Sequence, residues 1–185
     1  ARRVVVLVPG TDVYLDEARV PGRNRQRLLR AIPYALEEKL ATEVEQLHFA
    51  LAAPQGNNVH PVAVVERSRM DEWQNLLREQ GIIADQWIPE QLALPLVDGQ
   101  WSVLVDGDCA LVRTGPYAGF VIETDTLPVL LELMREPETA PERVQLFGAT
   151  VMDLQDLDVE MADPDAQPLE ILARGWQQGP VINLL

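Results

Sequence analysis

Cysteine, lysine and serine are scarce in this chain of 185 residues. Cys109 is the one cysteine, so no disulfide can form within the chain, which indicates a reducing compartment and excludes small disulfide-stapled scaffolds. Lys39 is the one lysine, and Ser68 and Ser102 are the two serines. No G-x-x-x-x-G-K-[ST], G-x-G-x-x-G or G-x-S-x-G motif occurs. The inventory therefore argues against P-loop enzymes, dinucleotide-binding enzymes and serine hydrolases.

Long apolar runs are also absent. No run reaches the roughly 18 apolar residues that a membrane-spanning helix needs, and the start ARRVVVLVPG lacks the apolar core and cleavage site of a signal peptide. We expect this stretch to be soluble by itself. A strand-like segment follows Ala1 directly, without an initiator methionine, so we expect a fragment of a longer protein.

Acidic residues, by contrast, are abundant and unevenly placed. The formal net charge is -14. Residues 1–93 contain 11 basic and 13 acidic residues, whereas residues 94–185 contain 4 and 16. Such a surface repels nucleic acid and anionic lipid, so we expect no nucleic-acid partner. Either a basic protein partner or solubility alone accounts for the acid.

The apolar pattern of the first half is typical of an α/β lobe. It predicts a hairpin of strands 4–8 and 13–20, then a helix over 23–41 that is kinked or broken at Pro33. A second hairpin of strands 47–51 and 59–65 is expected next. The last elements are a helix that begins at a Ser68–Asp71 cap and ends at Gly81, and a strand over 82–88; the buried stripe of that helix consists of Met70, Trp73, Leu76 and Leu77.

A turn-like, proline-containing stretch over 89–99 indicates a lobe boundary, and we place the domains at 1–92 and 93–185. After it we expect a meander of strands 101–105, 109–113 and 120–123, followed by a helix over 125–134 and a strand over 144–147. An acidic loop over 153–165 comes next. The last element is a helix over 168–177 with Leu169, Leu172 and Trp176 on one face.

Few side chains are candidates for chemistry. Cys109 stands in an apolar strand pattern without a basic neighbour, so we interpret it as core packing rather than as a nucleophile. His48 and His60 lack a His or Cys partner at metal-ligand spacing and are expected to be structural or exposed. We therefore predict no catalytic residue.

One acidic cluster has carboxylates that a hard cation could use, although it lacks the glycine and glutamate positions of an EF-hand. A solvated loop is the favoured interpretation, a calcium or magnesium site and a docking patch for a basic partner are alternatives, and we predict no metal. The cluster consists of Asp153, Asp156, Asp158, Glu160, Asp163 and Asp165.

One helix begins with bases and ends with acids, the opposite of the order that the helix dipole favours. Arginine stems covering apolar surface account for this order, and contact with a protein partner is the alternative. The residues that we predict to contact a partner are Arg23, Arg27, Arg30, Glu37 and Glu38; Arg25 belongs to the same basic cluster.

Four segments resemble one bacterial family. They read VLVPGTDV over 6–13, RLLRAIPYALEEKLATEVEQLHFAL over 27–51, PEQLALPL over 89–96 and GPVINLL over 179–185. Together they resemble the cytoplasmic region of the L component of the type II secretion system, the general secretion pathway protein L (GspL) family.

The resemblance implies an α/β fold of the actin-like ATPase type, built of ribonuclease H-like lobes with mixed sheets and flanking helices, here without the first strands of the first lobe. Members of that superfamily hold nucleotide with D-x-G hairpins and a G-G loop. In this chain the matching hairpin has Asp106, Gly107 and Asp108 without a following Ser or Thr, and the later loop has Gly148 without a second glycine. Both loops are degenerate, so we expect no cofactor and no nucleotide hydrolysis.

The resemblance further implies a non-catalytic adaptor at the cytoplasmic side of the inner membrane. It would recruit the N-terminal domain of the secretion ATPase, the E component, and would contact the M component through regions outside this fragment. An actin-like ATPase with residual magnesium-nucleotide binding at Asp106 or Asp108 is the alternative function, and a homodimer is a further candidate.

Overall fold

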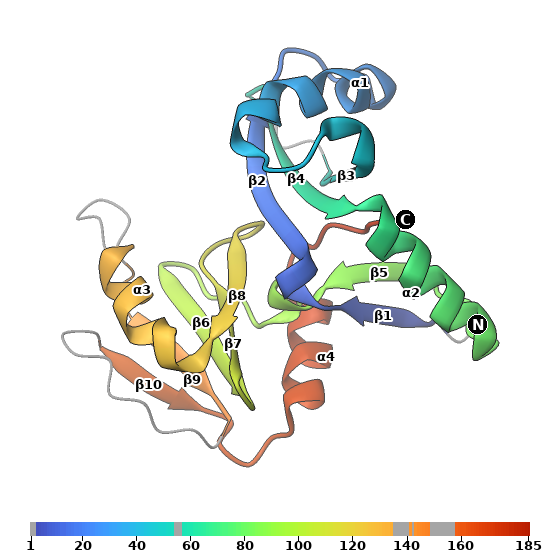
Figure 1. Ribbon diagram of the computed structural model, residues 1–185. Helices are drawn as coiled ribbons and strands as arrows, with labels where there is room; N and C mark the ends of the chain where they lie inside the picture. Colours follow the sequence, from blue (N-terminus) through green and yellow to red (C-terminus); the bar gives the residue numbers. More distant parts are fainter. Residues whose placement is uncertain (1–2, 54–56, 135–140, 142, 149–157) are drawn as a thin grey trace. The chain divides into compact units, whose positions relative to one another are not determined.

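The computed structural model describes residues 3–53, 57–134, 141, 143–148 and 158–185. The chain divides into two compact units (Figure 1): unit 1 contains Ala1–Pro89 and Val181–Leu185, and unit 2 contains Glu90–Pro180. The chain thus leaves unit 1 near the boundary that the sequence predicts after residue 92, but its last five residues belong to unit 1.

Unit 1 contains two sheets. Its strands and helices are β1 (Val5–Val8), β2 (Val13–Arg19), α1 (Arg25–Leu36), the 3-10 turns η2 (Glu37–Lys39) and η3 (Val44–Gln46), β3 (Leu47–Leu51), β4 (Val59–Glu66), α2 (Arg67–Glu79) and β5 (Gln86–Pro89). Strands β1 and β5 are parallel, and β2-β4-β3 form an antiparallel sheet.

The two hairpins expected in this half have different outcomes. Strands β3 and β4 pair as predicted. The predicted hairpin of 4–8 with 13–20 is wrong, because β1 pairs with β5 while β2 pairs with β4. A 3-10 turn over Gly10–Asp12 lies between β1 and β2. The continuous apolar run of β1 is the pattern of a strand in a parallel sheet, which distinguishes it from the alternating β2.

Helix α1 packs on the three-stranded sheet. Leu28, Ile32 and Leu36 lie on one face and are buried with Phe49 and Val64. A kink or a break was predicted at Pro33, and the break is wrong, because the helix continues through that proline to Leu36. Burial of this apolar face stabilises a helix more than propensity does, which explains why one interior proline does not end it.

Helix α2 differs from its prediction in its N-terminal cap and in its burial. It begins at Arg67, and no side chain caps it, so the expected Ser68 cap is wrong. The expected buried stripe is only half-buried: Met70, Trp73 and Leu77 are partly covered, whereas Leu76 is 58% exposed. Trp73 packs edge-on against Trp87 of β5 with ring centroids 6.2 Å apart. The predicted strand over 82–88 is confirmed only for its second half.

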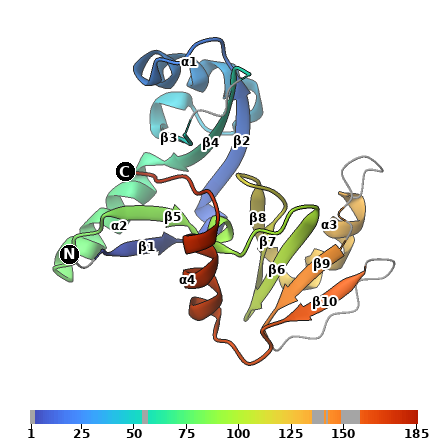
Figure 2. The ribbon, with the colours of Figure 1, turned by 180° about the vertical axis from the view of Figure 1, so that it is seen from behind.

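The C-terminal segment of unit 1 lies beside β5 (Figure 2). The Leu184 N–H donates to the Trp87 carbonyl at 3.0 Å, and the Trp87 N–H donates to Asn183 Oδ1 at 2.9 Å. These bonds attach the end of the chain to the first unit.

Unit 2 contains one mixed sheet in the order β10-β9-β6-β7-β8. Its elements are η4 (Glu90–Ala93), β6 (Gln100–Asp106), β7 (Cys109–Arg113), β8 (Gly119–Glu123), η5 (Thr124–Thr126), α3 (Leu127–Leu133), β9 (Arg143–Phe147), β10 (Val159–Ala162) and α4 (Pro168–Gln178). The β6-β7-β8 meander is confirmed. Part of the expected acidic loop is instead β10, which pairs in parallel with β9.

Two helices cover unit 2. Leu127 and Leu131 of α3 are buried in the core formed with Trp101 and Val103. Helix α4 packs against η4. Its buried residues are Ile171, Leu172 and Gly175, whereas Leu169 is 69% exposed, so the predicted apolar face is shifted. No helix in the described ranges is long and apolar enough to cross a membrane.

Candidate functional site

The outward face of α1 (Arg25–Leu36) carries two of the arginines that the sequence singles out, Arg27 and Arg30. Asn24 caps the helix, since its Oδ1 accepts the Arg27 N–H at 3.1 Å. With the apolar face turned to the sheet, Arg27, Arg30 and Tyr34 are exposed at spacings of three and four residues, and therefore share one face. Tyr34 is 64% exposed. Sequence reasoning missed this tyrosine, although its helical spacing from Arg30 could have found it.

The bases near α1 divide into two groups. Lys39 forms an ion pair with Asp16 at 2.8 Å, and Arg25 Nη1 donates to the Leu51 carbonyl at 3.1 Å, which attaches the helix to β3. Arg23, Arg27 and Arg30 form no ion pair with any residue that the structure describes.

Glu37 and Glu38 are exposed in η2, directly after α1. The five predicted contact residues thus lie along one continuous segment, with cations at its start and acids at its end. We call the exposed side chains of Arg23, Arg27, Arg30, Tyr34, Glu37 and Glu38 the α1 face. A partner-binding role for this face stays a prediction.

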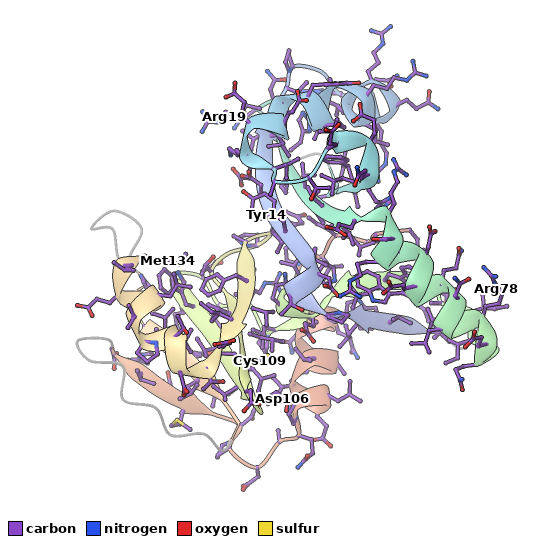
Figure 3. All side chains as sticks on the ribbon, viewed as in Figure 1. Tyr14, Arg19, Arg78, Asp106, Cys109 and Met134 are labelled. Atoms are coloured by element: carbon purple, nitrogen blue, oxygen red, sulfur yellow. The ribbon has the colours of Figure 1, made fainter. Side chains whose placement is uncertain are left out.

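A small polar cluster joins β2 to η2: it contains Tyr14 and Asp16 of β2 and Lys39 of η2 (Figure 3 labels Tyr14). Tyr14 Oη donates to Asp16 Oδ2 at 3.0 Å. Burial alone would raise the pKa of Asp16, but hydrogen bonds from Lys39, the Glu17 N–H and Tyr14 outweigh it and lower that pKa. The carboxylate therefore stays charged and holds η2 against the sheet.

The degenerate nucleotide hairpin is a tight turn between β6 and β7. Asp106 pairs with Cys109, so Gly107 and Asp108 are the two turn residues, and Gly107 has a φ of +60°, which a glycine adopts readily. Both aspartates are exposed (Figure 3 labels Asp106). The Thr124 N–H donates to the Asp108 carbonyl at 2.9 Å, so this backbone group is used within the fold.

Gly148 follows β9 with a φ of +87°. Its N–H donates to the Ala162 carbonyl of β10 at 3.3 Å, and a Cβ there would lie 3.6 Å from Leu104 Cδ1. This amide is thus engaged in the sheet rather than turned toward a ligand. The rest of that loop, over 149–150, lies outside the described residues.

Three of the acids near β10 are paired with arginines. Arg143 donates to Asp158 at 2.8 Å and to Glu160 at 2.7 Å, and Arg174 pairs with Asp163. Asp153 and Asp156 lie outside the described residues. No group of three metal-ligating side chains occurs in the described part of the chain.

Arg113 is a buried cation that the sequence analysis did not single out. Its guanidinium is fully buried in unit 2, and burial lowers its pKa to about 10. Its hydrogen-bond acceptors are all backbone carbonyls, those of Leu92, Leu94, Gly115, Pro116 and Pro180. In the sequence, the one sign of a buried arginine here was its position at the end of an apolar strand.

Cys109 is only partly buried at the start of β7. Both histidines bond backbone carbonyls: His48 Nε2 lies 2.7 Å from the Leu184 oxygen and His60 Nε2 lies 3.0 Å from the Val20 oxygen. These contacts are structural, as expected.

Comparisons with known proteins match this chain to one family. The family model described as type II secretion system protein L matches residues 1–185. A curated relative of that name from Dickeya chrysanthemi is 36% identical over 132 residues, which cover 71% of this chain and 33% of the relative. The chain thus spans about a third of that relative's length.

Two solved structures share the fold. The cytoplasmic domain of Epsl, an inner membrane component of the type II secretion system of Vibrio cholerae, aligns with a TM-score of 0.78 and 24% identity, covering 100% of this chain and 77% of that chain. A Bacteroides thetaiotaomicron protein with an actin-like ATPase fold and unknown function aligns with a TM-score of 0.51 and 14% identity, covering 93% and 73%. The predicted actin-like α/β fold is confirmed.

Proposed function

Because the chain belongs to the type II secretion system protein L family, we propose that it is a non-catalytic adaptor that recruits and anchors the secretion ATPase for protein export. It does so at the cytoplasmic side of the bacterial inner membrane. Its contacts with the M component involve regions of the protein beyond these residues.

The observation that supports this proposal best is the α1 face. Arginine and tyrosine are the residue types that most often dominate binding energy in protein interfaces. Here Arg27, Arg30 and Tyr34 are exposed side by side, and no described acid neutralises the arginines. On a chain with net charge -14, this cationic patch fits an acidic surface on the ATPase N-terminal domain and sets its orientation.

Binding of the purified ATPase N-terminal domain to this chain, measured by calorimetry, tests the proposal. We expect Arg27→Glu with Arg30→Glu to weaken binding by at least about tenfold, because reversed charges oppose an acidic partner. Tyr34→Ala is expected to cost about as much through lost buried aromatic area.

The matched control reverses two exposed arginines elsewhere, Arg19→Glu with Arg78→Glu, which makes the same change in net charge. If the control weakens binding as much as the α1 variants do, net charge rather than the α1 face governs binding. If none of the variants affects binding, the ATPase docks elsewhere.

A further inference from the structure

The outer edge of β8 has backbone groups that bond no residue in the part of the chain that the structure describes. Hydrogen bonds from the Thr124 N–H to the Asp108 carbonyl and from the Thr114 N–H to the Ala118 carbonyl set the phase of the β7–β8 ladder. In an antiparallel ladder only every second residue turns its N–H and C=O toward the partner strand. The backbone groups of Gly119, Val121 and Glu123 therefore point away from β7, and β8 is the last strand of the sheet.

Strand β8 lacks two of the features that usually block strand addition, proline and a run of charged side chains. Edge strands are commonly protected by charged side chains, proline or covering segments. In unit 1, the edge strand β2 carries Asp16, Glu17 and Arg19, and Arg25 occupies the Leu51 carbonyl of β3. Strand β8 reads GFVIE, with no proline and no charge before its last residue.

Carboxylates gather at one end of this edge. The β6–β7 turn lies beside the C-terminal end of β8, as the pairing of Cys109 with Glu123 shows. Asp106, Asp108, Glu123 and Asp125 are exposed there, and none forms an ion pair with a residue in the described ranges. A strand added to β8 would thus meet four negative charges at this end.

We propose that β8 binds an extended segment of a protein partner by antiparallel strand addition, with basic residues at the N-terminal end of that segment. The backbone groups of Val121 and its alternate neighbours supply the hydrogen bonds, and the four carboxylates select the basic end. A second copy of this chain fits less well, because residues 94–185 have 4 basic and 16 acidic residues and two copies would repel each other. This surface is separate from the α1 face.

A labelled peptide KRTVTVT, tested by fluorescence anisotropy against the 185-residue chain, is the probe. We expect Val121→Pro to weaken binding by at least about tenfold, since proline removes an outward donor and adds bulk at the edge. The ladder to β7 does not use that N–H, so the fold tolerates the change. Val121→Ala keeps the N–H and is expected to keep binding.

Charge is tested separately. Glu123→Lys with Asp125→Lys, or the peptide EETVTVT, is expected to weaken binding and to reduce its salt dependence. If Val121→Pro fails to fold by circular dichroism, the peptide KRPVPVP on the unchanged chain asks the same question, because it lacks the alternate N–H donors.

Equal affinity of the Val121→Pro and Val121→Ala variants for KRTVTVT would overturn the proposal, and so would equal binding of KRPVPVP. Self-association that Val121→Pro abolishes, without peptide binding, would assign the edge to a second copy instead. Loss of peptide binding with ATPase binding intact leaves the proposed function standing, since the two tests use different variants.

Discussion

At the scale of single residues, His48 is the titratable group most closely tied to the fold of unit 1. This residue of β3 is half-buried, and its ring bonds the Leu184 carbonyl of the C-terminal segment. Burial lowers the pKa of His48, the bond to Leu184 opposes this, and the nearby charge of Arg67 lowers it further. The folded state therefore prefers the neutral ring.

This preference predicts a pH dependence of stability. Because the folded pKa is below the ordinary value of about 6.5, the unfolded chain takes up the proton first, and stability falls as the pH drops through 6.5. We expect His48→Gln, which keeps an N–H donor, to remove this part of the loss. Urea unfolding at pH 5.5 and 7.5 measures it, and an unchanged pH dependence in the variant would contradict the assignment.

At the scale of elements, Arg113 joins segments that are far apart in sequence. Its guanidinium bonds carbonyls of η4, of the β7–β8 turn and of Pro180 after α4. Gly175 of α4 complements this packing, because a Cβ there would lie 2.3 Å from the Ala93 carbonyl. Unit 2 thus holds its first and last segments together around one buried cation.

Removing this cation leaves buried carbonyls without donors. We expect Arg113→Met to lower the free energy of unfolding by about 3 kcal/mol or more, since each orphaned buried group costs roughly 1 to 3 kcal/mol. Arg113→Lys also destabilises, because an ammonium cannot reproduce the planar fork.

Urea unfolding measures both changes. The exposed Arg78→Met is the control and is expected to change stability by no more than about 0.5 kcal/mol. A similarly small effect of Arg113→Met would show that the carbonyls find other donors.

At the scale of the whole molecule, the actin-like fold raises the alternative of residual magnesium-nucleotide binding at Asp106 or Asp108. The backbone groups described in these two loops are used within the fold: the Asp108 carbonyl by Thr124 and the Gly148 N–H by Ala162. The adaptor proposal therefore predicts no binding of nucleotide.

Thermal unfolding with millimolar magnesium and ATP tests this. We expect the midpoint to shift by less than about 1 °C, whereas ligand at a hundred times its dissociation constant would stabilise by about 2.7 kcal/mol and shift it by several degrees. A shift of that size that Asp106→Ala abolishes would favour the nucleotide-binding alternative.

Local sequence was sufficient for much of the fold. The β6–β7–β8 meander and the β3–β4 hairpin are predictable because short apolar runs and the glycine-containing turns between them are local signals. The α1 arginines were likewise found from a local pattern, the order of basic and acidic residues along the helix, which opposes the helix dipole.

Only the tertiary structure decided which strands pair across the chain and which side chains become buried. The partner of β1 lies about 80 residues away in β5, and no local pattern encodes that distance. The same holds for Arg113, whose acceptors extend to Pro180, and for β8, whose open edge depends on the strand order. Apolar patterns and charge order thus predicted an α/β fold and the charged residues of the α1 face, whereas long-range pairing determined the buried cation and made β8 an edge strand.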